Sequence, residues 1–260
     1  MRKSVWLGVL GSLAIVGALA LSGGPATAAG SPKPYTCTGG DIPSGTYASV
    51  TVTGFCDVPA DGTAVINIVG NLNVAAGALF DAQSSPSTIT VGKNVTAGAG
   101  SLMGLGCQPN GAHFFHPCTN EPDQASVITI NGNVTTTDAD TVLLNGISVK
   151  GNVTLTGGGG EIPWAIKDNT IGGNFTASNI TPDWFGLLYS QIGGNATLTN
   201  ITSTDPEDEG NASVNIVLNT IGKNLNCNGL GPRLSGGFIP GAVNTTGGKA
   251  TGQCVGLMGE

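Results

Sequence analysis

Four aspartates are the residues of this chain best suited to acid–base chemistry. Asp138 and Asp140 lie close together, and Asp168 and Asp183 follow within the next two repeats described below. Cleavage of a glycosidic bond needs a pair of carboxyl groups on one face, separated by about 7 Å. If the chain is an enzyme, we expect three or more of these carboxylates to lie within about 7 Å of one another in a groove. The alternative is that they lie apart on the surface.

Two cysteines and two histidines form a second group with metal-ligand chemistry. Cys107, His113, His116 and Cys118 could hold zinc with two sulfur and two nitrogen ligands. A disulfide between the two cysteines is the alternative, and we favour it if the chain is exported. The acidic segment at 205–210 matches no calcium-loop spacing, and we interpret it as a solvated loop. We predict no metal and no cofactor.

A short motif recurs seven times and must position all of these side chains. Each copy has Ile or Val three places before an asparagine, at least one Gly in the two places between, and an apolar residue directly after. Successive asparagines are 23, 39, 19, 22, 21 and 29 residues apart. The repeat asparagines are Asn71, Asn94, Asn133, Asn152, Asn174, Asn195 and Asn224.

The motif indicates one coil of a solenoid. Ile or Val ends a strand that points inward, Gly and Asn tolerate the left-handed backbone of a tight corner, and alternating residues resume a strand. One coil cannot bury its apolar face alone, so coils stack. With a degenerate copy at 49–53, we predict an all-β fold of about seven to eight coils over residues 46–228, with an insertion at 101–125. Residues 29–45 would lead into an N-terminal cap, and 229–260 would form an irregular C-terminal cap.

Two further groups of side chains suggest a binding surface. Threonines two and four places after the repeat asparagine should point outward on one face, and such a flat grid is similar to the faces of β-solenoid ice-binding proteins. It could equally face a glycan, a partner or only water. These threonines are Thr135, Thr137, Thr154, Thr156, Thr176, Thr197 and Thr199. Trp164, Trp184 and Tyr189 could form a sugar-stacking platform, or instead cover the core.

The N-terminus and the cysteines indicate export. Residues 1–28 have a basic start, an apolar run and a small-residue end, which is typical of a secretory signal peptide. Loss of Arg2 and Lys3 from the 9 basic residues leaves 7 against 16 acidic ones, a net charge of −9 that argues against nucleic acid. Six cysteines allow 15 pairings, and proximity favours Cys37–Cys56, Cys107–Cys118 and Cys227–Cys254.

The repeated Gly-Asn-apolar-Thr corner, the stacked Ile and Val and the closing Gly252-Gln253-Cys254 resemble secreted bacterial right-handed parallel β-helix proteins. The resemblance covers roughly residues 46–228 and is architectural. It implies a single-stranded right-handed parallel β-helix with disulfide-stapled ends. Enzymes with this fold, such as pectate lyases and polygalacturonases, attack polysaccharides, whereas tailspikes and adhesins use it as a binding or structural rod, so the fold alone does not choose a function.

We expect a secreted, non-enzymatic extracellular rod that is structural or binds a partner such as a polysaccharide or a cell wall. No membrane association is expected after signal cleavage, and the oligomeric state stays open. The alternative is a polysaccharide-active lyase or hydrolase that uses the four aspartates. A minor alternative is ice binding through the threonine face.

Overall fold

The computed structural model describes residues 30–109, 116–204, 214–236 and 243–258. The predicted signal peptide at 1–28, the acidic segment at 205–210 and His113 lie outside the described residues. The chain divides into two units, Met1–Ser31 and Pro32–Glu260, and all described strands belong to the second. No helix in the described part of the chain is long and apolar enough to cross a membrane.

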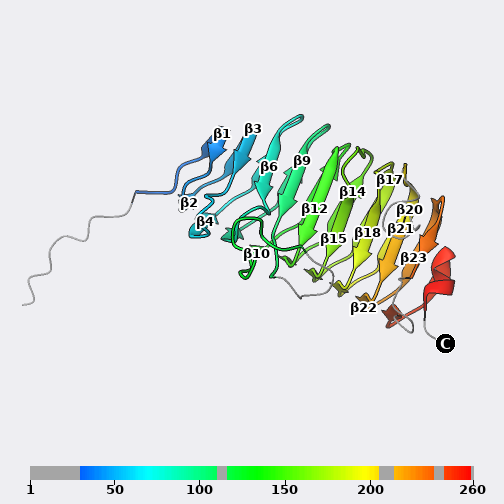
Figure 1. The fold of residues 1–260 in the computed structure, drawn as a ribbon. Coiled ribbons are helices and arrows are strands. Elements are labelled where there is room, and N and C mark those ends of the chain that lie inside the picture. The colour runs from blue at the N-terminus through cyan, green and yellow to red at the C-terminus, as the bar shows by residue number, and fades with distance from the viewer. Residues whose placement is uncertain (1–29, 110–115, 205–213, 237–242, 259–260) are drawn as a thin grey trace, which may run out of the picture. The chain divides into compact units, whose positions relative to one another are not determined.

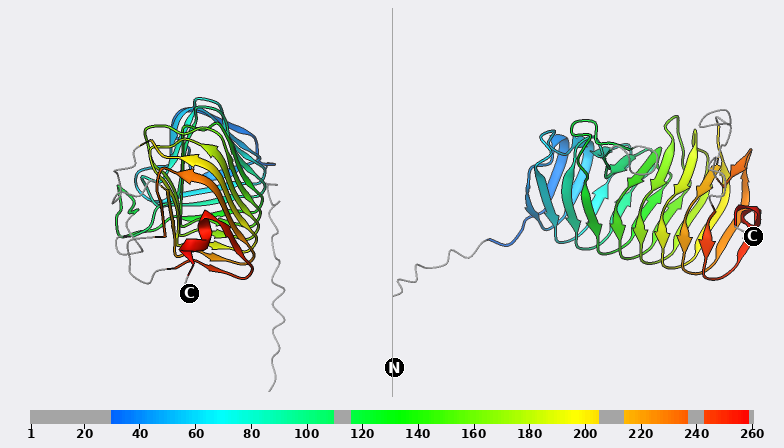
Figure 2. Two further views of the ribbon diagram at one scale, coloured as in Figure 1. Left: turned by 90° about the vertical axis from the view of Figure 1, so that its right-hand side faces the viewer. Right: turned by 60° about the horizontal axis from the view of Figure 1, so that its bottom comes forward.

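Parallel strands stacked in successive coils make up the second unit (Figures 1 and 2). They form two sheets, of 17 and 9 strands. The larger sheet contains two series of paired strands, which we call the A stack and the B stack. Both series begin with the long strands β1 (Tyr35–Asp41) and β3 (Val50–Asp57), which join the two stacks into one sheet. The smaller sheet is the C stack. Each coil passes through A, B and C in turn, and the prediction of an all-β fold of parallel strands is confirmed.

The strands of the three stacks alternate along the chain. Beyond β1 and β3, the A stack contains β5 (Leu72–Val74), β8 (Val95–Ala97), β11 (Val134–Thr137), β14 (Val153–Thr156), β17 (Phe175–Ile180), β20 (Ala196–Thr202), β23 (Leu225–Gly231) and β26 (Ala250–Gly252). The B stack adds β6 (Leu79–Ala82), β9 (Leu102–Leu105), β12 (Thr141–Asn145), β15 (Trp164–Lys167), β18 (Phe185–Leu188), β21 (Val214–Val217) and β24 (Leu234–Ser235). The C stack contains β2 (Gly45–Tyr47), β4 (Ala64–Ile68), β7 (Ser87–Val91), β10 (Val127–Ile130), β13 (Ser148–Val149), β16 (Thr170–Ile171), β19 (Gln191–Ile192), β22 (Thr220–Ile221) and β25 (Thr245–Thr246).

The repeat residues form the core between the stacks. The Ile or Val before each repeat asparagine ends a C strand, and the apolar residue after it begins an A strand; Ile171 and Phe175 show the pattern and are at most 1% exposed. Residues at the same repeat position pair in register from coil to coil, so that Val153 lies beside Phe175. The apolar interior is therefore continuous along the stack.

The repeat glycines are required for a reason that differs from the predicted one. None of the repeat Gly–Asn pairs has a positive φ angle. A Cβ atom at Gly172 would instead lie 2.5 Å from the carbonyl oxygen of Lys150 in the preceding coil, and at Gly193 equally close to that of Gly172. Left-handed residues occupy the other two corners, as at Asn179 between A and B and at Asp168 between B and C. Backbone proximity, rather than backbone handedness, excludes side chains at the repeat corner.

Both ends of the described array carry strands beyond the predicted range of 46–228. β1 pairs with β3 in the segment expected to be a leader, and β26 pairs with β23 in the segment expected to be an irregular cap. The A stack thus has ten described strands, which exceed the predicted seven to eight coils. The 3-10 helix η1 (Gln253–Leu257) follows the last of them.

All three predicted disulfides are present. Cys37–Cys56 joins β1 to β3, Cys107–Cys118 closes the insertion, and Cys227–Cys254 ties β23 to η1. No cysteine is free. The three disulfides indicate an oxidising environment such as the extracellular space.

Candidate functional site

The outer surface of the A stack carries two parallel files of hydroxyl and amide side chains, which we call the A face. Adjacent members of each file are paired in strand register. The first file is Thr36, Thr51, Asn73, Thr96, Thr135, Thr154, Thr176, Thr197, Asn226 and Thr251. The second file is Thr137, Thr156, Ser178, Thr199 and Asn228.

The A face is regular because alternate residues of each A strand point inward. In β14, Val153 and Leu155 are fully buried, whereas Thr154 and Thr156 are partly exposed. Members of one file repeat about every 4.8 Å along the stack, and the two files are about 6.7 Å apart. From β1 to β26 the first file extends for about 43 Å.

The hydroxyls of the A face have few partners within the protein. Thr96 donates to the Asn73 Oδ1 atom at 2.7 Å, and Thr251 donates to the Asn226 Oδ1 atom at 2.7 Å. The hydroxyls of the central threonines make no hydrogen bond with any described residue; these are Thr135, Thr154, Thr176 and Thr197. They are available to a ligand or to water.

The repeat asparagines form a ladder along the corner beside the A face. The Oδ1 atom of Asn152 accepts a hydrogen bond from the backbone N–H of Asn174 at 2.8 Å, and Asn174 accepts from Asn195 in the same way. The ladder runs from Asn71 to Asn224, where the N–H of Lys249 completes it. It holds the A strands of neighbouring coils in register.

The four aspartates do not form a compact group. Asp140 precedes β12, whereas Asp168 follows β15, which pairs with β12. The two residues therefore lie at opposite ends of the B stack, six residues apart in register, or about 20 Å. Asp183 is at the same end as Asp140 but two coils away, about 10 Å, and Asp138 is on the exposed A–B corner. The convergence that a hydrolase requires is absent from this set.

Of the two alternatives for Trp164, the structure shows a core position rather than a surface platform. This side chain is fully buried as the first residue of β15, and its indole N–H donates to the carbonyl oxygen of Asp140 at 2.8 Å. Trp184 is only 7% exposed, because its ring lies against Gly186 on β18. Tyr189 is half-buried at the B–C corner, where burial raises the pKa of its phenol. These rings pack against the coils instead of forming a flat surface for a sugar.

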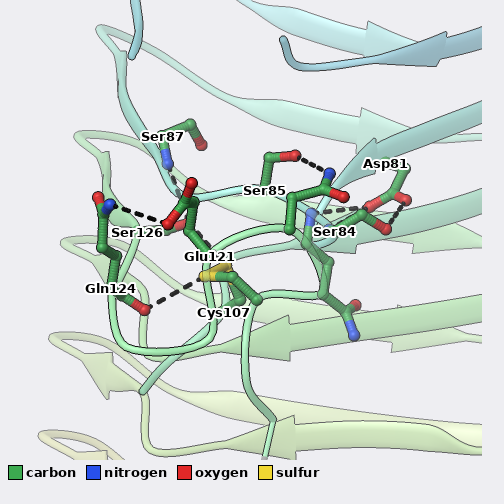
Figure 3. Close-up of a disulfide and its surroundings, with 11 residues drawn as sticks. Asp81, Ser84, Ser85, Ser87, Cys107, Glu121, Gln124 and Ser126 are labelled. Atoms are coloured by element: carbon green, nitrogen blue, oxygen red, sulfur yellow. Dashed lines mark hydrogen bonds between the residues drawn. A yellow bond between two sulfur atoms is a disulfide. The ribbon is translucent and has the colours of Figure 1, made fainter. Parts of the chain in front are cut away.

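The described residues of the insertion depart from the repeating pattern of the coils, and the Cys107–Cys118 disulfide lies at their centre (Figure 3). Because its cysteines are joined, they are not available as zinc ligands. The hydroxyl of Ser126 lies 3.3 Å from the Cys107 sulfur and accepts the backbone N–H of Ser87 at 3.2 Å. The Asn120 amide donates to Ser85 at 2.6 Å. These contacts fasten the insertion to the coil that contains β7.

A cavity of about 240 Å³ lies between the insertion and the outer face of the B stack. Its apolar lining includes Phe55, which is 56% exposed, together with Leu79 and Leu102. Asp81 and His116 provide its ionisable groups. The Asp81 carboxylate accepts the backbone N–H groups of Gln83 and Ser84 and the Ser84 hydroxyl. Asp81 therefore shapes a turn, and the cavity has no pair of carboxylates for hydrolysis.

His116 is held neutral in the folded protein. Burial and, to a smaller extent, the positive charge of Lys167 lower its pKa to about 4, and the carboxylate of Asp81 opposes both effects. Because the folded pKa lies below the unfolded value of about 6.5, the unfolded chain binds the proton more strongly. The contribution of His116 to stability is fully present above pH 6.5 and is lost as the pH falls toward 4.

This shift predicts a pH-dependent difference between the wild type and His116→Gln. The wild type should lose more stability than the variant between pH 6.5 and 4, because only the wild type must bury a group that becomes charged. Urea unfolding midpoints at several pH values measure this difference. Equal pH dependence of the two proteins across this window would contradict the assigned environment of His116.

A second, buried ladder crosses the B–C corner and was missed by the repeat alignment. Its members are Asn169, Ser190, Asn219 and Asn244, all at most 1% exposed. The Asn219 Oδ1 atom accepts the Ser190 N–H at 2.9 Å, and its amide donates to the Leu187 carbonyl at 2.8 Å. The signal was an Asn-Thr pair that lies five places before the repeat asparagine at 169–170 and 219–220, and five places before Lys249 at 244–245.

No protein family model, no curated protein and no solved structure matches this chain. Its function is therefore argued from its own surfaces.

Proposed function

We propose that this chain is a secreted, non-enzymatic rod that binds an extracellular polymeric glycan, such as that of a cell wall, through its A face. The rod would be a single-stranded right-handed parallel β-helix that leaves the cell through the signal peptide at 1–28. The observation that carries this proposal is the in-register file of threonine and asparagine side chains along the A stack.

A repeating surface favours a repeating ligand. Each coil presents the same two or three polar groups, and one such contact is weak. A polymer that repeats along its length can make the same contact at every coil, and the linked contacts add without new loss of translational freedom. Hydroxyl and amide groups both donate and accept hydrogen bonds, as a glycan surface requires. The absence of a convergent aspartate group supports binding without cleavage.

The A face is tested by a pair of lysine substitutions. Thr154→Lys combined with Thr176→Lys should lower retention on isolated cell walls at least about tenfold, because two long cations on adjacent coils block flat contact and each lost contact costs about 1 kcal/mol. Thr90→Lys combined with Thr129→Lys is the matched control. These residues are also partly exposed register partners, but they lie on the C stack.

The control variant should bind as the wild type does. Equal retention of both double variants would exclude the A face as the binding surface. An equal loss in both would point to charge rather than to the face. Circular dichroism and unfolding midpoints of each variant establish that the fold is intact.

Ice is a second candidate ligand, favoured by the central threonines whose hydroxyls have no protein partner. Their methyl and hydroxyl groups repeat on a flat surface, which suits a crystalline ligand as well as a polymer. Thermal hysteresis of the purified protein tests this alternative. Hysteresis that the Thr154→Lys and Thr176→Lys substitutions abolish would replace the glycan proposal, and its absence would remove the ice proposal.

A further inference from the structure

The first coil of the stack has an open strand edge. β1 pairs with β3 and β2 pairs with β4, and no strand in the described part of the chain pairs with the other side of either. Five of the seven residues of β1 are exposed. The N–H of Tyr35 donates to Ser49 in the second coil, so the N–H and C=O groups of the next residue, Thr36, face the open side. An unpaired edge of this kind is a template for a further strand.

The opposite end of the stack shows how this protein closes an edge (Figure 2). The Gln253 side chain in η1 takes the place of a strand beside β23. Its Oε1 atom accepts the N–H of Leu230 at 2.8 Å, and its Nε2 atom donates to the carbonyl oxygen of Leu230 at 2.7 Å. The Cys227–Cys254 disulfide fastens η1 there. No described side chain bonds to the backbone of Thr36 in this way.

The charges of the first coil lie at opposite ends of the open edge. Lys33 is the only cation in residues 30–58, and its carbonyl oxygen accepts the N–H of Ala48, so it extends the run of β1. Asp41 ends β1, and Asp57 and Asp81 follow it in register on the next two strands. Burial and the carboxylates of Asp81 and Asp41 raise the pKa of Asp57. Neither Lys33 nor Asp41 has an ion-pair partner among the described residues.

We propose that two copies of this chain join head to head through their first coils, with the two β1 strands antiparallel across a two-fold axis. Antiparallel pairing brings the start of one β1 beside the end of the other. Lys33 of each copy then lies near Asp41 of the second copy, where it offsets the repulsion among the carboxylates. The same contact forms twice because the interface is isologous.

The inward and outward positions of β1 agree with this pairing. Thr36 and Asp41 lie on the outer side of the coil, whereas Cys37 and Gly40 lie beside the buried strand positions of β3. Thr36 can therefore pair with Asp41 of the second copy, and Cys37 with Gly40 of the second copy, so that outward residues meet outward residues and inward residues meet inward ones. A register that placed them on opposite sides would be excluded by the pleat.

The same axis also suits the C side of the coil. In this register it crosses β1 between Thr38 and Gly39. Because Tyr35 pairs with Val50, the first coil is 15 residues long, and the point about half a coil beyond the axis is Thr46, the centre of β2. The strand β2 can therefore pair with its own copy about Thr46 while β1 pairs with its copy, and both open edges are closed together.

Sedimentation equilibrium of the mature chain over a range of concentrations tests the proposal. The wild type should be a dimer. Lys33→Glu and Asp41→Lys should each raise the dissociation constant at least about tenfold, because each places like charges together at both ends of the interface. The combined Lys33→Glu and Asp41→Lys variant restores opposite charges in reversed order and should dimerise again. Lys249→Glu, at an exposed position near the other end of the stack, is the matched control and should leave the dimer unchanged.

Hydrogen exchange locates the contact independently of the charges. The N–H of Thr36 should exchange more slowly in the wild-type dimer than in Lys33→Glu. A wild type that is monomeric at every concentration, or that forms species larger than a dimer, would overturn the proposal. Single reversals that dimerise normally, or a folded combined variant that stays monomeric, would overturn it as well. Circular dichroism of each variant establishes that the fold is intact.

Discussion

Replacement of Trp164 with alanine is expected to lower the free energy of unfolding by about 3–5 kcal/mol. Trp164 is the largest fully buried side chain in the described part of the chain, and it begins β15 in the middle of the B stack. The substitution removes its contacts in the core and leaves the carbonyl oxygen of Asp140 without the indole donor at 2.8 Å. The surrounding coils are fixed by their hydrogen bonds and cannot close the cavity.

Equilibrium denaturation followed by circular dichroism measures this loss. Phe55→Ala is the control, because this aromatic side chain is 56% exposed and its loss should change stability by no more than about 0.5 kcal/mol. If Trp164→Ala were as stable as the wild type but bound glycan poorly, the ring would have to be a surface contact, and its placement in the core would be wrong.

Replacement of Asn219 with leucine should cost about 3 kcal/mol, the second largest effect expected. Leucine has a similar volume but cannot accept from the Ser190 N–H or donate to the Leu187 carbonyl. Both backbone groups would be left without partners in the interior, at about 1–3 kcal/mol each. The amide contact with the Asn244 Oδ1 atom at 2.9 Å would be lost as well.

The exposed ladder provides the matched comparison. Asn152→Ala removes one acceptor from the Asn174 N–H, but water can replace it, so we expect a loss of about 1 kcal/mol or less. Chemical denaturation of both variants under the same conditions gives the comparison. An equal cost for the two substitutions would mean that burial does not distinguish the ladders.

The interior of the A and C stacks could be predicted from the sequence because each coil repeats it. Ile171 and Phe175 flank the same Gly–Asn corner as their counterparts in the other copies. One alignment on the repeat asparagine therefore predicted that the residues at both positions face the interior. The outward threonines followed from simple alternation along the A strands. Thr154 and Thr176 were expected on one face, and the structure pairs them in register.

The B stack could not be predicted in the same way. The A–B corner varies in length from coil to coil, so alignment on the repeat asparagine does not align the B strands. The sequence therefore left open whether Trp164 forms a surface platform or covers the core, and its strand pairing and burial place it in the core.

The most direct test of the central claim is co-sedimentation of the mature protein with isolated cell walls and insoluble polysaccharides, with reducing sugar ends assayed in the supernatant. A binding rod predicts saturable retention on at least one of these polymers without release of sugar. Release of sugar would contradict the non-enzymatic assignment and require a catalytic group other than the separated aspartates. Absence of retention on every polymer would contradict the proposed glycan-binding role of the A face.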